Sequence, residues 1–158
     1  MLTFEEFATV LCQIEAQLNS RPLCALTEDT SDVDFLTPGH FLIGQPLNAA
    51  PDPSLAHLKE NRLGRWQYLQ RLQQAFWEKW HLEYLSSLQK RNKWKFPQEE
   101  LKLGALVILK EHNMAPTQWR RGRVIQLHPG PDGKTRVVTL KTINGEVKRP
   151  IVKLVHLF

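Results

Sequence analysis

Apolar side chains recur every three or four residues between Asn61 and Lys95, which is the spacing of one face of an α-helix. The stretch contains no proline, and Gly64 is its one glycine. Asn61 is suited to cap the first turn, and Pro97 is suited to end the helix just beyond it. The pattern predicts one long amphipathic helix that needs a partner on its apolar face. That face is expected to consist of Leu63, Trp66, Leu69, Leu72, Phe76, Trp80, Tyr84 and Leu88, widened by Tyr68, Trp77 and Leu85.

A second helical pattern begins almost at the first residue. Thr3 and Glu6 have the spacing of a capping box, in which each side chain bonds to the other residue's main-chain N–H. An apolar stripe follows and predicts a helix that ends near Asn19. The stripe consists of Phe4, Phe7, Leu11, Ile14 and Leu18. What covers it is left open.

The chain between these two helices is less regular. Residues 28–34 are rich in Asp and Glu but lack the glycine and the downstream Glu of a calcium loop. We therefore predict a solvated acidic loop at this point. Residues 46–53 contain prolines and alanines and predict an extended strap without regular structure.

A short helix is predicted over residues 37–44. Thr37 can cap it, Pro38 suits its first turn, and Gly44 can end it. His40 is interpreted as a capping or surface residue. Phe41 to Ile43 would dock on a neighbour.

The last third of the chain changes to the pattern of short β-strands. Strands are predicted over residues 105–110, 122–128, 136–142, 146–149 and 154–157. Asn144-Gly145 predicts a type I′ hairpin turn, and residues 150–153 a tight turn before the last strand. Five short strands with one helical turn before the last favour an SH3-like barrel. The expected fold class is α+β: an N-terminal helix with an irregular strap, one long linker helix, and a five-stranded SH3-like β-barrel.

Charge changes sign along the chain. Residues 1–61 carry two Lys/Arg against nine Asp/Glu, whereas residues 62–158 carry nineteen against seven. Such asymmetry indicates a polyanionic partner for the basic part, and the alternative is a solvated surface that keeps the protein soluble. Residues 101–158 alone carry eleven Lys/Arg and three Asp/Glu.

These basic side chains are the candidate DNA-binding residues. Arginine can bond to two phosphate oxygens at once, and no predicted element is suited to reading base edges. If about half of the eleven Lys/Arg of residues 101–158 contact phosphates, log K should fall with log salt at a slope of about −5. Trp119, which lies next to Arg120, Arg121 and Arg123 in the sequence, is interpreted as a core residue. The candidates are Arg120, Arg121, Arg123, Lys134, Arg136, Lys141, Lys148 and Arg149.

Other classes of site lack their motifs. Cys12 and Cys24 form no disulfide framework, and the scattered histidines have no zinc-ligand spacing, so we expect neither a metal nor a cofactor. The first residues are acidic, unlike a signal peptide, and no apolar run is long enough to cross a membrane. We expect an intracellular protein without a membrane partner.

Several short segments occur together in one order. They are residues 13–23, 36–44, 61–67, 80–89, 122–124, 128–130 and 148–154. Together they resemble the integrase C-terminal region of BEL/Pao-type LTR retrotransposon polyproteins, over essentially the whole chain.

This resemblance implies three parts. Residues 1–60 would be the end of an RNase H-like integrase core, 61–97 a linker helix, and 98–158 an SH3-like C-terminal domain of the DUF5641 type that contacts double-stranded DNA. The family's catalytic Asp/Asp/Glu set is not matched, so the resemblance implies no catalytic residue and no enzyme activity in this chain. It implies a nuclear protein that contributes to DNA integration.

A protein-interaction module is the alternative. SH3-like barrels also bind peptides and histone tails, and the long aromatic helix could join other integrase subunits. The chain could then be a decayed or host-adopted copy of the element, which the sequence does not decide.

Overall fold

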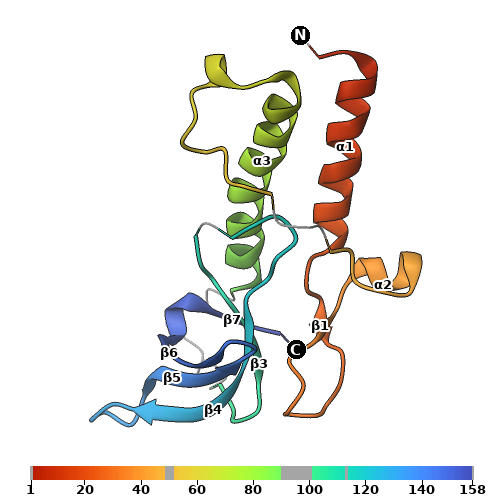
Figure 1. Cartoon of the computed structure of the whole chain (residues 1–158). Coiled ribbons are helices and arrows are strands. Elements are labelled where there is room, and N and C mark those ends of the chain that lie inside the picture. The colour runs from red at the N-terminus through yellow and green to blue at the C-terminus, as the bar shows by residue number, and fades with distance from the viewer. Residues whose placement is uncertain (1, 49–51, 90–100, 113, 158) are drawn as a thin grey trace. The chain divides into compact units, whose positions relative to one another are not determined.

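The computed structural model describes residues 2–48, 52–89, 101–112 and 114–157. It combines helices with a five-stranded antiparallel sheet, which confirms the mixed class (Figure 1). In chain order the elements are α1 (Phe4–Asn19), β1 (Cys24–Ala25), β2 (Phe35–Leu36), α2 (Pro38–Ile43), η1 (Glu60–Arg62), α3 (Arg65–Leu88), β3 (Leu106–Leu109), β4 (Arg121–Pro129), β5 (Thr135–Thr142), β6 (Gly145–Pro150), η2 (Ile151–Lys153) and β7 (Leu154–His156).

The chain divides into two compact units, each assembled from separated segments. Unit 1 contains the described residues of 1–21, 37–83 and 112–118, and unit 2 those of 22–36, 84–111 and 119–158. The boundaries predicted at residues 60 and 97 are not tested by this division and stay a prediction.

Helix α1 begins and ends as predicted. The N–H of Thr3 donates to Glu6 at 2.8 Å, and the N–H of Glu6 donates to the Thr3 hydroxyl at 3.3 Å, which completes the capping box. The predicted apolar stripe is not the buried face, however. Val10 and Gln17 are buried, whereas Phe4 is 82% exposed.

Helix α2 also has the predicted ends. The N–H of Thr37 donates to Nδ1 of His40 at 3.0 Å, so His40 is a capping residue. Gly44 ends the helix at φ 73°, in the left-handed region that suits glycine. Its apolar side chains Phe41, Leu42 and Ile43 are exposed, not docked on a neighbour.

Helix α3 is shorter than predicted at its first end. The turn η1 takes up Asn61, and α3 starts at Arg65 with Gly64 before it. Gln67 accepts a hydrogen bond from the N–H of Gly64 at 2.9 Å and so satisfies one free donor of the first turn. The predicted end of this helix at Lys95 and its stop at Pro97 lie outside the described residues.

The buried face of α3 is centred one residue away from the predicted stripe. Its buried residues recur every four positions and include two polar ones: Leu69, Gln73, Trp77, His81 and Leu85. Trp77 donates from Nε1 to the carbonyl of Met114 at 2.9 Å, and His81 stacks on it at 5.2 Å between ring centroids. Trp66, expected in the apolar face, is 54% exposed.

The predicted acidic loop at residues 28–34 is confirmed, and it connects the two short strands of a hairpin. Strands β1 and β2 pair antiparallel, with Cys24 opposite Leu36. We call residues 22–36 the acidic hairpin, because they hold four Asp/Glu and no Lys or Arg. Those four residues are Glu28, Asp29, Asp32 and Asp34.

The five-stranded sheet confirms the predicted strands within one or two residues. Its order is β6-β5-β4-β3-β7, so β6 and β7 are its edges and no pairing between them closes a barrel within the described chain. One face carries the core cluster of Val107, Leu109, Val124, Val138, Leu140 and Leu154.

The β5–β6 hairpin is present, but its turn differs from the predicted type I′. Thr142 pairs with Gly145, so Ile143 and Asn144 are the central residues. Neither has positive φ, whereas Gly145 has φ 109°. Only the glycine takes the conformation that was expected of both Asn144 and Gly145.

Candidate nucleic-acid interface

Alternation along β5 separates the sheet's two faces. Val138 and Leu140 are buried in the core cluster, and Thr139 and Lys141 therefore point to the opposite face. Lys148 lies opposite Thr139, and Arg123 lies opposite Lys141. We call this second side the outer face. It carries Arg121, Arg123, Gln126 and His128 of β4, Val137, Thr139 and Lys141 of β5, and Glu146, Lys148 and Pro150 of β6.

Lys141 and Lys148 are the exposed cations of this face. The register places them as diagonal neighbours on adjacent strands, about 7–8 Å apart between their Cα atoms. Neither makes an ion pair with another described residue, although Glu146 lies directly opposite Lys141. Both ammonium groups are therefore available to an anionic ligand.

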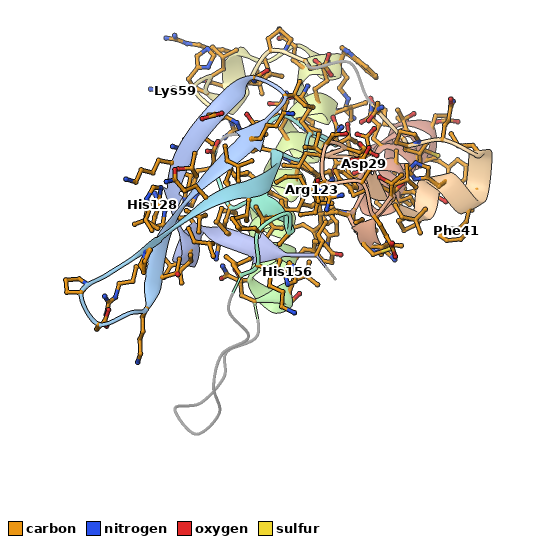
Figure 2. The ribbon with its side chains drawn as sticks, turned by 90° about the horizontal axis from the view of Figure 1, so that it is seen from below. Asp29, Phe41, Lys59, Arg123, His128 and His156 are labelled. Carbon is orange, nitrogen blue, oxygen red and sulfur yellow. The ribbon has the colours of Figure 1, made fainter. Side chains whose placement is uncertain are left out.

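Polar side chains missed in the sequence extend this face. His128 and Thr139 are joined by a hydrogen bond of 2.8 Å between Nε2 and Oγ1, and Gln126 is exposed beside them. Figure 2 shows His128 on the sheet. A bulge at Ile125 shifts the alternation of inward and outward side chains along β4 by one residue. The strand register is therefore needed to assign Gln126 and His128 to the outer face.

Lys134 and Arg136 lie at the hairpin between β4 and β5. Arg136 donates to both carboxylate oxygens of Asp132, at 3.0 and 2.6 Å. The hydrogen bond of Arg136 is the main reason that the pKa of Asp132 lies below its usual value. Lys134 is exposed without an ion pair to any described residue. Arg136 is exposed but already paired.

Arg120 and Arg149 share one carboxylate. Glu111 accepts from Arg120 at 2.6 Å and from Arg149 at 3.4 Å. Partial burial acts to raise the pKa of Glu111, but the hydrogen bonds and charges of the two arginines outweigh it, so the pKa is lowered. Since Arg149 lies opposite Val138, it projects from the core side of the sheet and not from the outer face.

Arg123 is buried beneath the acidic hairpin, with an exposed fraction of 5%. Its guanidinium donates to three main-chain carbonyls: Asp32 at 2.6 Å, Gly104 at 2.9 Å and Thr27 at 3.0 Å. Figure 2 shows Arg123 next to the segment that carries Asp29. These bonds fasten the hairpin to the sheet and leave Arg123 inaccessible to a phosphate in this conformation.

Arg121 also faces the hairpin but is less enclosed. It forms an ion pair with Asp34 at 2.6 Å, and the two side chains are 25% and 56% exposed. Its guanidinium carbon lies 5.0 Å from the ring centroid of Phe35, a cation–π contact.

The eight predicted residues thus fall into separate groups instead of one patch. Lys141 and Lys148 are open on the outer face, and Lys134 and Arg136 are exposed at the hairpin. Arg121 and Arg123 are covered by the acidic hairpin, and Arg120 and Arg149 converge on Glu111.

Trp119 agrees with its interpretation as a buried residue. It is 6% exposed, and its ring meets Tyr84 edge-on at 5.9 Å between centroids. The Tyr84 hydroxyl in turn donates to the carbonyl of Pro22 at 2.7 Å.

In the described part of the chain, no three His, Cys, Asp or Glu side chains gather as a metal site. None of its helices has the length and apolar character needed to cross a membrane.

A family model described as "Family of unknown function (DUF5641)" matches residues 64–157. No curated protein and no solved structure matches. The expected DUF5641-type region is therefore confirmed, and the resemblance to BEL/Pao integrases stays a prediction.

Proposed function

The chain belongs to the family of unknown function DUF5641, and we propose that its C-terminal sheet binds the phosphate backbone of double-stranded DNA. The observation that carries the proposal is the pair Lys141 and Lys148, exposed as diagonal neighbours and without ion pairs to described residues. Ammonium groups held at this spacing suit successive phosphates of a nucleic-acid strand.

The charge of the surrounding sequence supports this proposal. Residues 101–158 hold eleven Lys/Arg against three Asp/Glu, a field that attracts polyanions. Lys134 and Arg136 extend the exposed set beyond the outer face. With four contacts in place of the larger number expected from sequence, log K should fall with log salt at a slope of about −4.

We propose binding with little dependence on base sequence. Lysine acts as a point charge and fits phosphates without fixed geometry, whereas base recognition needs donors and acceptors aimed at base edges in a groove. Gln126 and His128 are the polar side chains nearest to the lysines by register, and His128 is already bonded to Thr139.

The wider role rests on the resemblance described above. We propose that the sheet is an SH3-like module of a retrotransposon integrase, a non-catalytic part that holds nuclear DNA during integration. Five antiparallel strands with the 3₁₀ turn η2 before the last support this assignment.

A second candidate is protein contact through unit 1. Its exposed large apolar side chains include Phe4, Phe7 and Leu11 of α1 and Phe41, Leu42 and Ile43 of α2. Exposed apolar side chains that form a contiguous patch are typical of an interaction surface. Sedimentation velocity would test self-association by this surface, since a monomer at all concentrations argues against it.

Fluorescence anisotropy with two unrelated duplexes across a salt series tests the DNA-binding proposal. We expect similar affinities for both duplexes and a slope that becomes shallower by about two in a Lys141→Ala/Lys148→Ala variant. The matched control is Lys59→Ala/Lys79→Ala, which removes two exposed lysines of unit 1 and should leave the slope unchanged. Equal slopes for the two variants, or no binding at about 50 mM salt, would contradict the proposal.

A further inference from the structure

The acidic hairpin covers one end of the outer face. Arg121 and Arg123 are alternate residues of β4, so they point to the same side of the sheet. Arg123 lies opposite Lys141 in the register, which places both arginines on the side that carries the open lysines. The row of cations therefore runs from Lys148 across Lys141 to Arg123 and Arg121, and the hairpin occupies its last two positions.

The hairpin holds its carboxylates in a fixed arrangement. Thr27 donates from its hydroxyl to Asp32 at 2.8 Å, and Ser31 donates to Asp29 from both N–H and hydroxyl at 2.8 Å. The pKa of Asp29 is lowered mainly by the hydrogen bond from the Ser31 N–H. The pKa of Asp32 is lowered mainly by the hydrogen bond from the Asp34 N–H. Both groups are ionised at neutral pH, and the charge of Arg123 also acts on both of them.

The two arginines are held in different ways. Arg123 is buried and bonded to three carbonyls, so it fastens the hairpin. Arg121 has one carboxylate partner, and its buried Nε has no hydrogen-bond acceptor among the described residues. An exposed ion pair of this kind is weak and is screened by salt.

We propose that the acidic hairpin is an internal competitor of the phosphate backbone, in which Asp34 holds Arg121 away from bound nucleic acid. This inference rests on the proposed function and adds its regulation. A phosphate that reaches Arg121 must displace one exposed carboxylate, whereas Arg123 stays in place and keeps the hairpin docked. The hairpin thereby weakens binding without blocking the outer face.

An Asp34→Asn variant tests this competition in the full chain. The hydrogen bonds that Asp34 makes within the hairpin use its main-chain N–H and carbonyl, so the substitution preserves them. Glu28→Gln is the matched control: it removes the same charge from the same loop, and none of the described arginines bonds to Glu28. The probe is the same pair of unrelated fluorescent duplexes, titrated across the same salt series. The proteins compared are the wild type, Asp34→Asn, Glu28→Gln, Arg121→Ala and the Asp34→Asn/Arg121→Ala double variant.

We expect the salt slope of Asp34→Asn to be steeper by about 0.9 than that of Glu28→Gln, because one more phosphate is contacted. Between about 50 and 200 mM salt, the affinity of Asp34→Asn should therefore fall about threefold more than that of Glu28→Gln. Arg121→Ala alone should change the affinity less than about twofold. The double variant should lose the whole gain, since Arg121 is the group that Asp34 releases.

Two results would overturn the inference in distinguishable ways. If the wild type binds DNA but Asp34→Asn behaves as Glu28→Gln does, or the gain persists in the double variant, the competition is absent while the proposed function stands. If neither the wild type nor Asp34→Asn binds any duplex at about 50 mM salt, both proposals fail.

Discussion

Arg123 donates from Nε to the main-chain carbonyl of Asp32 at 2.6 Å, although the two residues are 91 positions apart. The same guanidinium bonds to the carbonyls of Thr27 and Gly104, so a single side chain joins the acidic hairpin, the approach to β3, and β4. Main-chain carbonyls cannot move independently of the chain, and the contact therefore fixes the hairpin more firmly than the Arg121–Asp34 ion pair does.

Replacing Arg123 by alanine should therefore destabilise unit 2. The substitution leaves three carbonyls without their donor, and we expect a loss of about 3 kcal/mol in the free energy of unfolding. Arg123→Lys should recover only part of it, because an ammonium cannot bond to three carbonyls with the planar geometry of a guanidinium. Urea denaturation followed by circular dichroism measures both. The control Arg136→Ala removes an exposed arginine, and an equal loss in that variant would contradict the structural role of Arg123.

Gly104 provides a second test of the docked hairpin. It has φ +81°, and a Cβ at this position would lie 2.7 Å from Cγ2 of Thr30. Gly133 has a similar φ of +74° with no atom within 4 Å of its Cβ position. Alanine at either glycine costs about 1–2 kcal/mol for the left-handed backbone. Gly104→Ala should cost measurably more in thermal unfolding and should increase proteolysis of the hairpin, whereas equal costs would mean that Thr30 does not press on Gly104.

Local patterns were sufficient where one short stretch determines the structure. The Thr3–Glu6 capping box defines the start of α1, and the alternation in residues 135–142 defines β5. Each depends on hydrogen bonds or side-chain alternation within a few residues, which are visible in sequence. The turn after Thr142 shows the limit of such rules, since Asn-Gly indicated the hairpin but not which residues form its centre.

Features that depend on distant contacts could not be predicted in this way. Gln73 and His81 are buried although they are polar. The pattern of apolar residues therefore predicted a buried face of α3 that is displaced by one residue from the observed face. In the sequence, Arg123 is one of several candidate cations. Its structural role depends on contact with a hairpin whose Asp32 lies 91 residues earlier in the chain. The site prediction identified the correct chemical type of residue, and long-range contact decides which arginines and lysines are accessible.

Trp77 tests the centre of the buried face of α3. It is 1% exposed and donates to the carbonyl of Met114 at 2.9 Å. Trp77→Phe loses this hydrogen bond and part of the packed volume, so we expect a loss of about 2 kcal/mol in stability. Trp66→Phe is the matched control, since Trp66 is exposed on the same helix and its replacement should change stability by less than about 0.5 kcal/mol. Thermal unfolding of both variants distinguishes the two faces, and equal shifts would restore the stripe predicted from sequence.

Glu6 and Arg65 form an ion pair that connects the first turns of α1 and α3 within unit 1. We expect this pair to make the stability of the protein depend on pH in the acid range. The hydrogen bond from Arg65, followed by that from the Thr3 N–H, lowers the pKa of Glu6 from 4.5 to about 2. A carboxylate whose pKa is lower in the folded state contributes stability that is complete above its unfolded value. This contribution should therefore be present above about pH 4.5 and should disappear as the pH falls toward about 2.

Thermal unfolding of the wild type and of Glu6→Gln, measured from about pH 6 to about pH 2, checks this expectation. Glutamine still caps Thr3 but cannot pair with Arg65 as an ion, so the two midpoints should differ at pH 6 and converge at the acid end. Glu5→Gln removes a charge from the same helical turn without touching the pair, and its midpoint should follow that of the wild type throughout. Parallel curves for Glu6→Gln and the wild type would mean that the ion pair contributes nothing in solution, because only a proton uptake that differs between the folded and unfolded states can make the curves converge.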